Sequence, residues 1–460
     1  MPWPQSDPTR EDAAFRQLCT DCGISRTAKA KRCAQACQFI KPEYERLEIM
    51  VHGRSRGQPL AQVLREPVQE KAKAQPSNHS AADQATPPAL GDESFFGPMQ
   101  AMYRAKLQQP LKGAQWTGIT TALAARLLDL NLIDAVITMK ADPNDRWKPT
   151  PVIVTAPDEL AQCRGMRMGY APLLALIEPA LARGLKRLAV IGIPCQVYAL
   201  RALHADWEQQ GLASLYVIGT PCSDNTHTER FHQFLALLDP HPETIHYLEF
   251  RADYHVELRF SDGRKRLIPF LQLPLSTLPP DFFPTTCKSC VDYSNVLADI
   301  TVGYMGGSGD QWLIVRNAKG RFMLDQLQGQ IDLTAPTQAG KRSGAVKAFH
   351  ENLLKAAGGL PLRRMPDWLR PIVGWLMPRI GPRGLEFARA RIEMKAIETI
   401  VTLRQQHPAR IKSMVPKHVW QLASAYGIEP QAGEHEHPSS RDAAAARSPP
   451  GKQVTKGIEH

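Results

Sequence analysis

The chain has 460 residues, of which 43% are hydrophobic, so a wholly disordered or collagen-like protein is excluded and one large domain or two ordinary ones fit. Its formal net charge is +11, which favours acidic partners. No helix-turn-helix, zinc-finger helix or aromatic RNA-binding strand is apparent, so we expect no nucleic-acid partner.

The first seventeen residues are polar and include both Asp and Glu, which is unlike a secretory signal peptide. No apolar run reaches the roughly 18 residues that a transmembrane helix needs. We therefore expect a cytoplasmic protein, in which nine cysteines indicate metal binding or redox chemistry rather than disulfides. The sequence does not decide whether the protein contacts a membrane surface or forms a homo-oligomer.

The composition divides the chain into segments. We expect disordered tails over 1–14 and 431–460, because both are polar and the second contains Ser-Pro-Pro. A compact cysteine-bearing segment covers 15–53. The stretch 54–92 is rich in Gln, Ala, Pro and Lys, which predicts a linker with one helix near 61–74. The folded body follows.

Strand and helix patterns alternate in the first part of that body. Short β-branched runs are found at 133–139, 152–155, 187–193 and 215–219, and helical patterns at 118–130, 171–183 and 197–209. This alternation predicts an α/β fold with a mixed, largely parallel sheet flanked by helices, within a domain over 93–330.

The pattern then changes. Antiparallel strands are expected at 246–250, 256–260 and 264–270, with Asp262-Gly263 as a hairpin turn, and further strands at 299–305 and 312–315. We expect a helical C-terminal region over 331–430, in which 385–404 has the strongest helical pattern. The aromatic and apolar stretch 368–377 could pack as an ordinary helix, line a pocket or lie on a membrane surface.

Four cysteines near the start share one short segment. They follow the spacing C-x2-C-x10-C-x3-C and are Cys19, Cys22, Cys33 and Cys37. Four thiolates this close in sequence can hold one tetrahedral zinc or one iron–sulfur cluster, and spacing alone leaves both open. The basic residues between them, such as Lys31, could offset the charge of a cluster or simply be solvated.

A second set of four cysteines is dispersed. Cys195 and Cys222 each follow a predicted strand, and the carboxyl ends of neighbouring parallel strands meet at one edge of a sheet. Cys287 and Cys290 form a C-x2-C pair. The four could therefore form a second metal site, although Cys195 and Cys222 could also be small buried residues at turns. We expect Cys163 to take no part.

Two glycine-containing loops could approach a cofactor. The loop at 113–121 opens a predicted helix and could bind phosphate through backbone N–H groups, or be an ordinary N-cap. The loop at 303–309 follows a predicted strand and could pass close to a planar cofactor, or be a plain turn.

Several blocks of sequence resemble the family of β-subunits of deazaflavin-reducing hydrogenases and dehydrogenases. They are Cys19-x2-Cys22-Gly23, Ala36-Cys37-Gln38-Phe39, His52-Gly53-Arg54, Gln115-Trp116-Thr117-Gly118-Ile119, Gly219-Thr220-Pro221-Cys222 and the stretch from Cys287 to Gly306. The resemblance runs from about residue 15 to 425. It is closest to the ferredoxin-dependent members that act on chlorophyll precursors, on account of the block 381–388.

The resemblance implies an oxidoreductase with FAD and two 4Fe-4S clusters, held by the two cysteine sets. It implies that reduced ferredoxin donates electrons and that the substrate is a 3,8-divinyl (proto)chlorophyllide a, whose 8-vinyl group is reduced. It assigns the flavin site to Trp116, Thr117, Gly118, Ile119, Thr120, Tyr304 and Gly306. The alternatives are reduction of a 7-hydroxymethyl chlorophyll, oxidation of a reduced deazaflavin, and a pure electron-transfer subunit.

The sequence departs from the family pattern at one position. Ser25 stands where the family has a third cysteine, and Cys33 could take the place of that ligand. The proton donor is not identified by any motif. By chemistry alone, Asp292, Tyr293, Glu93 and His52 are candidates.

Overall fold

The computed structural model describes residues 19–40, 42–56, 92–251, 253–304, 309–356 and 366–434. The predicted tail over 1–14, all but the first residues of the tail over 431–460, most of the predicted linker with its helix, and Gly306 lie outside the described residues.

The main sheet has the strand order β11-β1-β10-β9-β5-β4-β2-β3. Its strands are β1 (Ala101–Leu107), β2 (Ala135–Asp142), β3 (Asp145–Val154), β4 (Arg187–Gly192), β5 (Ser214–Gly219), β9 (Ile300–Gly303), β10 (Gln311–Val315) and β11 (Ile331–Thr334). The neighbours β2, β4, β5 and β9 run parallel, and the outer pairs are antiparallel. The predicted mixed α/β sheet is therefore confirmed, with its parallel strands at the centre.

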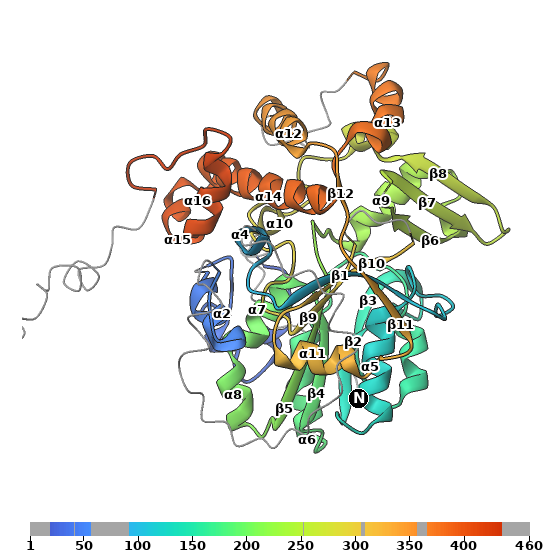
Figure 1. Ribbon diagram of the computed structural model, residues 1–460, viewed down its shortest axis with the longest axis vertical. Helices are drawn as coiled ribbons and strands as arrows, with labels where there is room; N and C mark the ends of the chain where they lie inside the picture. Colours follow the sequence, from blue (N-terminus) through green and yellow to red (C-terminus); the bar gives the residue numbers. More distant parts are fainter. Residues whose placement is uncertain are drawn as a thin grey trace, which may run out of the picture.

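Helices cover both faces of this sheet (Figure 1). Alternate strand residues point to opposite faces. Leu188 and Val190 pack with α7 (Pro194–Ala202) and with the first cysteine segment, whereas Ala189 packs with α5 (Ile119–Asp129). The helices α6 (Ile177–Ala182) and α8 (His204–Gln209) lie on the α7 face, and α11 (Ala318–Asp325) lies on the α5 face.

A smaller sheet forms beside the main one. It consists of β6 (Ile245–Phe250), β7 (His255–Phe260) and β8 (Lys265–Pro269), and α9 (Thr228–Leu238) packs on it. The predicted hairpin is confirmed, because β7 and β8 pair antiparallel through a turn in which Gly263 has φ +87°. A positive φ is easily adopted only by glycine.

The C-terminal helices form a third layer over one side of the main sheet. They are α12 (Arg342–Ala356), α13 (Leu369–Ile380), α14 (Leu385–Gln406), α15 (Ile411–Met414) and α16 (Lys417–Ser424). Apolar side chains of α12, α14, α15 and α16 pack with α4 (Asp92–Phe96) and with Met102, Trp312 and Ile314 of the sheet, whereas α13 packs on β8 and the residues after it. None of the helices in the described ranges is both long and apolar enough to cross a membrane.

Several elements differ from their predictions. The strand β11 and the short pair β12 (Gln338–Ala339) and β13 (Arg383–Gly384) lie in the region predicted to be helical, and β11 joins the main sheet beside β1. The helix predicted over 197–209 is two helices, α7 and α8. Both ends of the predicted linker are packed, since Arg54 and Asp92 are buried.

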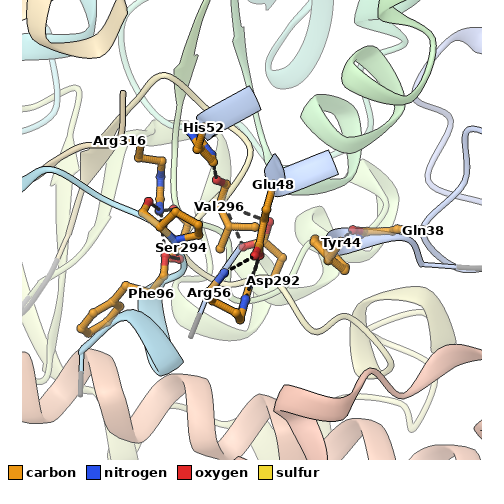
Figure 2. A network of polar contacts seen from close by, with 11 residues as sticks. Gln38, Tyr44, Glu48, His52, Arg56, Phe96, Asp292, Ser294, Val296 and Arg316 are labelled. Carbon is orange, nitrogen blue, oxygen red and sulfur yellow. Dashed lines mark hydrogen bonds and ion pairs between the residues drawn. The ribbon is translucent and has the colours of Figure 1, made fainter. Parts of the chain in front are cut away.

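A buried polar network holds the first cysteine segment against the body (Figure 2). The guanidinium of Arg316 is fully buried and donates to the carbonyl oxygens of Phe96 at 2.7 Å and Ser294 at 2.8 Å. On α2 (Tyr44–His52), His52 Nε2 lies 2.8 Å from the carbonyl oxygen of Val296. Irregular backbone around residues 292–299 thus finds its hydrogen-bond partners in side chains.

We expect Arg316→Leu to lower the free energy of unfolding by about 3 kcal/mol, because it leaves several buried carbonyl groups without donors. Arg146→Leu is the matched control, since Arg146 is exposed on β3 and its loss should change stability by less than about 0.5 kcal/mol. Urea unfolding followed by tryptophan fluorescence measures both. Equal effects of the two substitutions would contradict a structural role for Arg316.

Candidate functional site

Cys195 and Cys222 lie at the same edge of the main sheet, as the sequence predicted. The strands β4 and β5 that precede them are parallel neighbours. Asn295 Nδ2 ties the two strand ends together, since it lies 2.8 Å from the Gly192 carbonyl oxygen and 3.2 Å from that of Thr220. The two thiols therefore converge because of the sheet's topology.

Cys287 and Cys290 approach the same place from α10 (Thr285–Lys288) and the residues after it. The pKa of the Cys222 thiol is raised first by burial and then by the neighbouring thiols of Cys287, Cys195 and Cys290. The four cysteines of the dispersed set are thus neighbours in space. Cys163 lies at the end of a 3-10 helix (Pro157–Cys163), and none of the groups that shift its pKa is a thiol.

Polar groups surround the sulfur atoms of this set. The Asn225 amide donates to Cys287 Sγ at 3.4 Å, the Tyr170 hydroxyl lies 3.4 Å from the same sulfur, and Gln38 Nε2 donates to Cys290 Sγ at 3.6 Å. Such donors stabilise negative charge on sulfur, which is the form that binds metal. The arrangement fits a thiolate-ligated cluster.

A buried cation lies beside the second pair. Lys395 on α14 is almost fully buried, and its ammonium donates to the Cys287 carbonyl at 2.6 Å, to Asp224 at 2.8 Å and to Glu398 at 2.9 Å. No sequence motif marks this lysine, although the predicted helix over 385–404 contains it. Its positive charge would offset part of the charge of nearby thiolates.

The first set is held by short 3-10 turns. Burial, then the neighbouring thiols Cys33, Cys37 and Cys195, raise the pKa of Cys22. Burial also raises the pKa of Cys37 to about 11, with Cys33 and Cys19 as neighbouring thiols. Ser25, in contrast, is exposed. The structure therefore places Cys33, and not residue 25, among the other three cysteines.

The two sets adjoin each other. Cys195 is one of the thiols that raise the pKa of Cys22, and the Thr20 side chain is hydrogen-bonded to Cys195. Within the described ranges, no three His, Cys, Asp or Glu side chains converge as they would around a single metal ion. In a cubane cluster each thiolate binds a different iron, so its thiolates stand farther apart than around one ion.

An aromatic cluster marks the predicted flavin segment. The Trp116 and Tyr304 rings have centroids 5.5 Å apart, and Phe387 of α14 contacts Tyr304 edge-on at 5.4 Å. The Tyr304 hydroxyl donates to the Arg251 carbonyl at 2.6 Å, which fixes the ring. Aromatic rings held in this way suit contact with a planar cofactor.

The other predicted flavin residues are held by a glutamine that the sequence did not reveal. Gln311 Oε1 accepts hydrogen bonds from the Thr117 hydroxyl at 3.0 Å and from the Ile119 amide at 3.2 Å. Gly118 has φ +92° and begins α5, and Thr120 lies in its first turn. Gln311 of β10 thus caps the start of α5 and occupies the Ile119 N–H, one of the backbone groups that could have bound phosphate.

Of the four candidate proton donors, only Tyr293 lies close to both the thiols and the aromatic cluster. Its carbonyl accepts from the Cys222 amide at 3.0 Å, and its hydroxyl is one of the groups that raise the pKa of Tyr304. Asp292 accepts from the Val296 amide, and Glu93 forms an ion pair with Arg54. These two carboxylates serve the packing of loops.

The chain matches a known family in two consecutive parts. Residues 102–178 match the N-terminal part of the coenzyme F420 hydrogenase/dehydrogenase beta subunit, and residues 185–339 match the C terminus of the same beta subunit. Together they include the aromatic residues Trp116 and Tyr304 and all four cysteines of the dispersed set.

Three relatives cover different shares of the chain. An uncharacterized protein, all1601, of Nostoc sp. is 34% identical over 90% of this chain and 94% of its own length. The chloroplastic 7-hydroxymethyl chlorophyll a reductase of Oryza sativa is 33% identical over 89% of this chain and 82% of its own. The coenzyme F420 hydrogenase subunit beta of Methanothermobacter thermautotrophicus is 27% identical over 47% of this chain and 75% of its own length.

His52 precedes the matched segments, and its imidazole is half-buried and contacts polar groups through both ring nitrogens. Its Nδ1 lies 3.4 Å from the side-chain nitrogen Nδ2 of Asn317, and Nε2 lies near the Val296 carbonyl. Burial, and then the Arg316 guanidinium, lower the pKa of the imidazole to about 3, against the opposing effect of the Val296 carbonyl. The ring is therefore neutral in the folded chain.

This pKa predicts a pH dependence of stability. Because the folded value lies below the unfolded value of about 6.5, protonation favours the unfolded chain, and stability is lost as the pH falls below 6.5. At pH 5 the loss from His52 is about 2 kcal/mol relative to pH 7. Urea unfolding at both pH values should show a smaller loss for His52→Gln, whereas exposed His241→Gln should behave like the wild type. An unchanged pH dependence in His52→Gln would contradict this assignment.

Proposed function

The chain belongs to the family of coenzyme F420 hydrogenase/dehydrogenase beta subunits, and on that premise we propose that it reduces the 8-vinyl group of a 3,8-divinyl (proto)chlorophyllide a with electrons from reduced ferredoxin. The observation that best supports a reductase of this kind is how the cysteines and the aromatic residues are arranged in space. The two sets of four cysteines adjoin each other, and Tyr293 lies near both Cys222 of the dispersed set and Tyr304 of the aromatic cluster.

The residues indicate which groups would hold each cofactor. Two 4Fe-4S clusters would be bound by the first set, Cys19, Cys22, Cys33 and Cys37, and by the dispersed set, Cys195, Cys222, Cys287 and Cys290. FAD would lie against Trp116 and Tyr304. When bound, it supplies the exchange between single electrons and an electron pair, which a one-electron donor and a two-electron reduction require.

The chain's own residues would order this site. Gln311 fixes the loop that presents Trp116, and the Arg251 carbonyl fixes Tyr304. Reduction of a vinyl group to ethyl takes two electrons and two protons, and buried Tyr293 lies near the Cys222 thiol and near Tyr304. Exposed Lys31, beside the first set, fits an acidic electron donor such as ferredoxin.

A second function has specific support. The rice relative, which is 33% identical over most of both chains, is a 7-hydroxymethyl chlorophyll a reductase. Converting a hydroxymethyl group to methyl and water also takes two electrons and two protons, so the same redox centres would serve. The two functions differ in the pigment and in which substituent faces the aromatic cluster.

The two are separated by one assay. Anaerobically purified protein with dithionite-reduced ferredoxin should convert divinyl chlorophyllide a to its 8-ethyl form, seen by chromatography and absorbance, and leave 7-hydroxymethyl chlorophyll a unchanged. The reverse selectivity would favour the second function. Turnover of neither pigment, with both cofactors present, would favour a pure electron-transfer role and overturn the proposal.

The cysteine assignment predicts a metal count. Wild-type protein should contain about eight irons and eight labile sulfides per chain, and Cys33→Ser should lose about four of each, because one cluster lacks a ligand. Cys163→Ser is the matched control and should keep the full content. Zinc without iron in the wild type, or unchanged iron in Cys33→Ser, would contradict the assignment of the first set.

A further inference from the structure

The helix α13 lies at one extremity of the molecule, on the small sheet (Figure 1). One side packs against β8 and the residues after it. A Cβ built on Gly374 would lie 3.3 Å from Pro269 Cβ, and Arg370 is buried. This contact fixes the orientation of the helix, and it determines which side chains point away from the protein.

The opposite side of α13 is apolar and exposed. Trp368 is 72% exposed, Trp375 61%, Ile380 58% and Ile372 54%. These are the four most exposed large apolar side chains among the described residues. A soluble surface rarely gathers tryptophan and isoleucine in this way unless it binds something.

The edge strand β8 carries a further exposed apolar side chain next to α13. Residues 265, 267 and 269 point to one face of that strand, because side chains alternate. Pro269 meets Gly374, so Leu267 and Lys265 lie on the face that carries α13. Leu267 is 53% exposed. We call the five side chains Trp368, Ile372, Trp375, Ile380 and Leu267 the α13 patch.

The charge around the α13 patch is mainly positive, and the carboxylate of Asp367, which precedes Trp368, is paired with Arg370. The stretch 368–383 contains three arginines and no Asp or Glu. The Arg379 guanidinium stacks on the Trp375 ring at 4.1 Å, and Arg383 is exposed. A second copy meeting this patch across a twofold axis would bring like charges together, which disfavours self-association.

We propose that the α13 patch docks the protein on the surface of an anionic lipid bilayer. Tryptophan and isoleucine would enter the headgroup region, where amphipathic aromatic rings are favoured, and Arg379 and Arg383 would meet lipid phosphates. The helix lies along the surface and does not span it. This docking does not depend on which pigment the protein reduces.

The test uses full-length, cofactor-loaded protein and vesicles of phosphatidylcholine with or without phosphatidylglycerol. The wild type should sediment with the anionic vesicles, and added salt should weaken binding. The double variant Trp368→Ser, Trp375→Ser should bind at least about tenfold more weakly. Ile49→Ser removes an exposed apolar side chain from α2 and is the matched control, which should bind like the wild type.

Insertion of the tryptophan side chains into the bilayer can be measured separately. Brominated lipids should quench tryptophan fluorescence of the wild type and much less that of the double variant. Iron and flavin contents equal to the wild type show that the variants are folded. No binding to anionic vesicles, binding that the double variant retains, or a wild-type dimer in sedimentation equilibrium that the double variant abolishes would overturn the proposal.

Discussion

The site depends on how the first cysteine segment is fastened to the loop that follows Cys290. The loop over 292–299 is irregular, so its carbonyl groups need donors that a sheet would otherwise supply. Arg316 supplies several of them, and His52 lies beside the Val296 carbonyl (Figure 2). Arg56 pairs with Glu48 within the same network. A buried guanidinium is stable only where such acceptors surround it, so Arg316 and the loop fix each other, while His52 and Val51 join the segment to Val296 and Asn317.

This fastening explains why the two cysteine sets face each other. Gln38 comes directly after Cys37 in sequence and donates to the sulfur of Cys290, and Thr20 comes directly after Cys19 and is hydrogen-bonded to Cys195. Neighbours of the first set thus complete the surroundings of the second. A shift of the segment by one residue would remove both contacts.

The sequence predicted the features that depend on local pattern or on parallel-sheet topology. The predicted strand ends placed Cys195 and Cys222 at one edge of the sheet, and Asp262-Gly263 predicted the turn of the hairpin. It did not predict β1, whose partners β10 and β11 lie some two hundred residues away. Nor could it find Gln311, because the amide of Ile119 that it accepts from is equally distant in sequence. The sequence also left open whether α13 is exposed, because its apolar pattern fits a helix packed in the core as well as a helix on a surface.

Ser25, which stands where the sequence resemblance predicts a third cysteine, follows a tight turn of the backbone. Gly23 has φ +107°, and a Cβ built there would lie 2.5 Å from the Ala175 amide nitrogen, so the chain turns tightly against the body at this point. The following 3-10 turn, Ile24–Arg26, buries Ile24 and leaves residue 25 facing solvent. Cys33 ends the next turn, Ala30–Arg32, and lies near Cys22 and Cys37. Cys33 thus neighbours the other cysteines of the first set, whereas residue 25 is exposed, which supports Cys33 as the fourth member of that set.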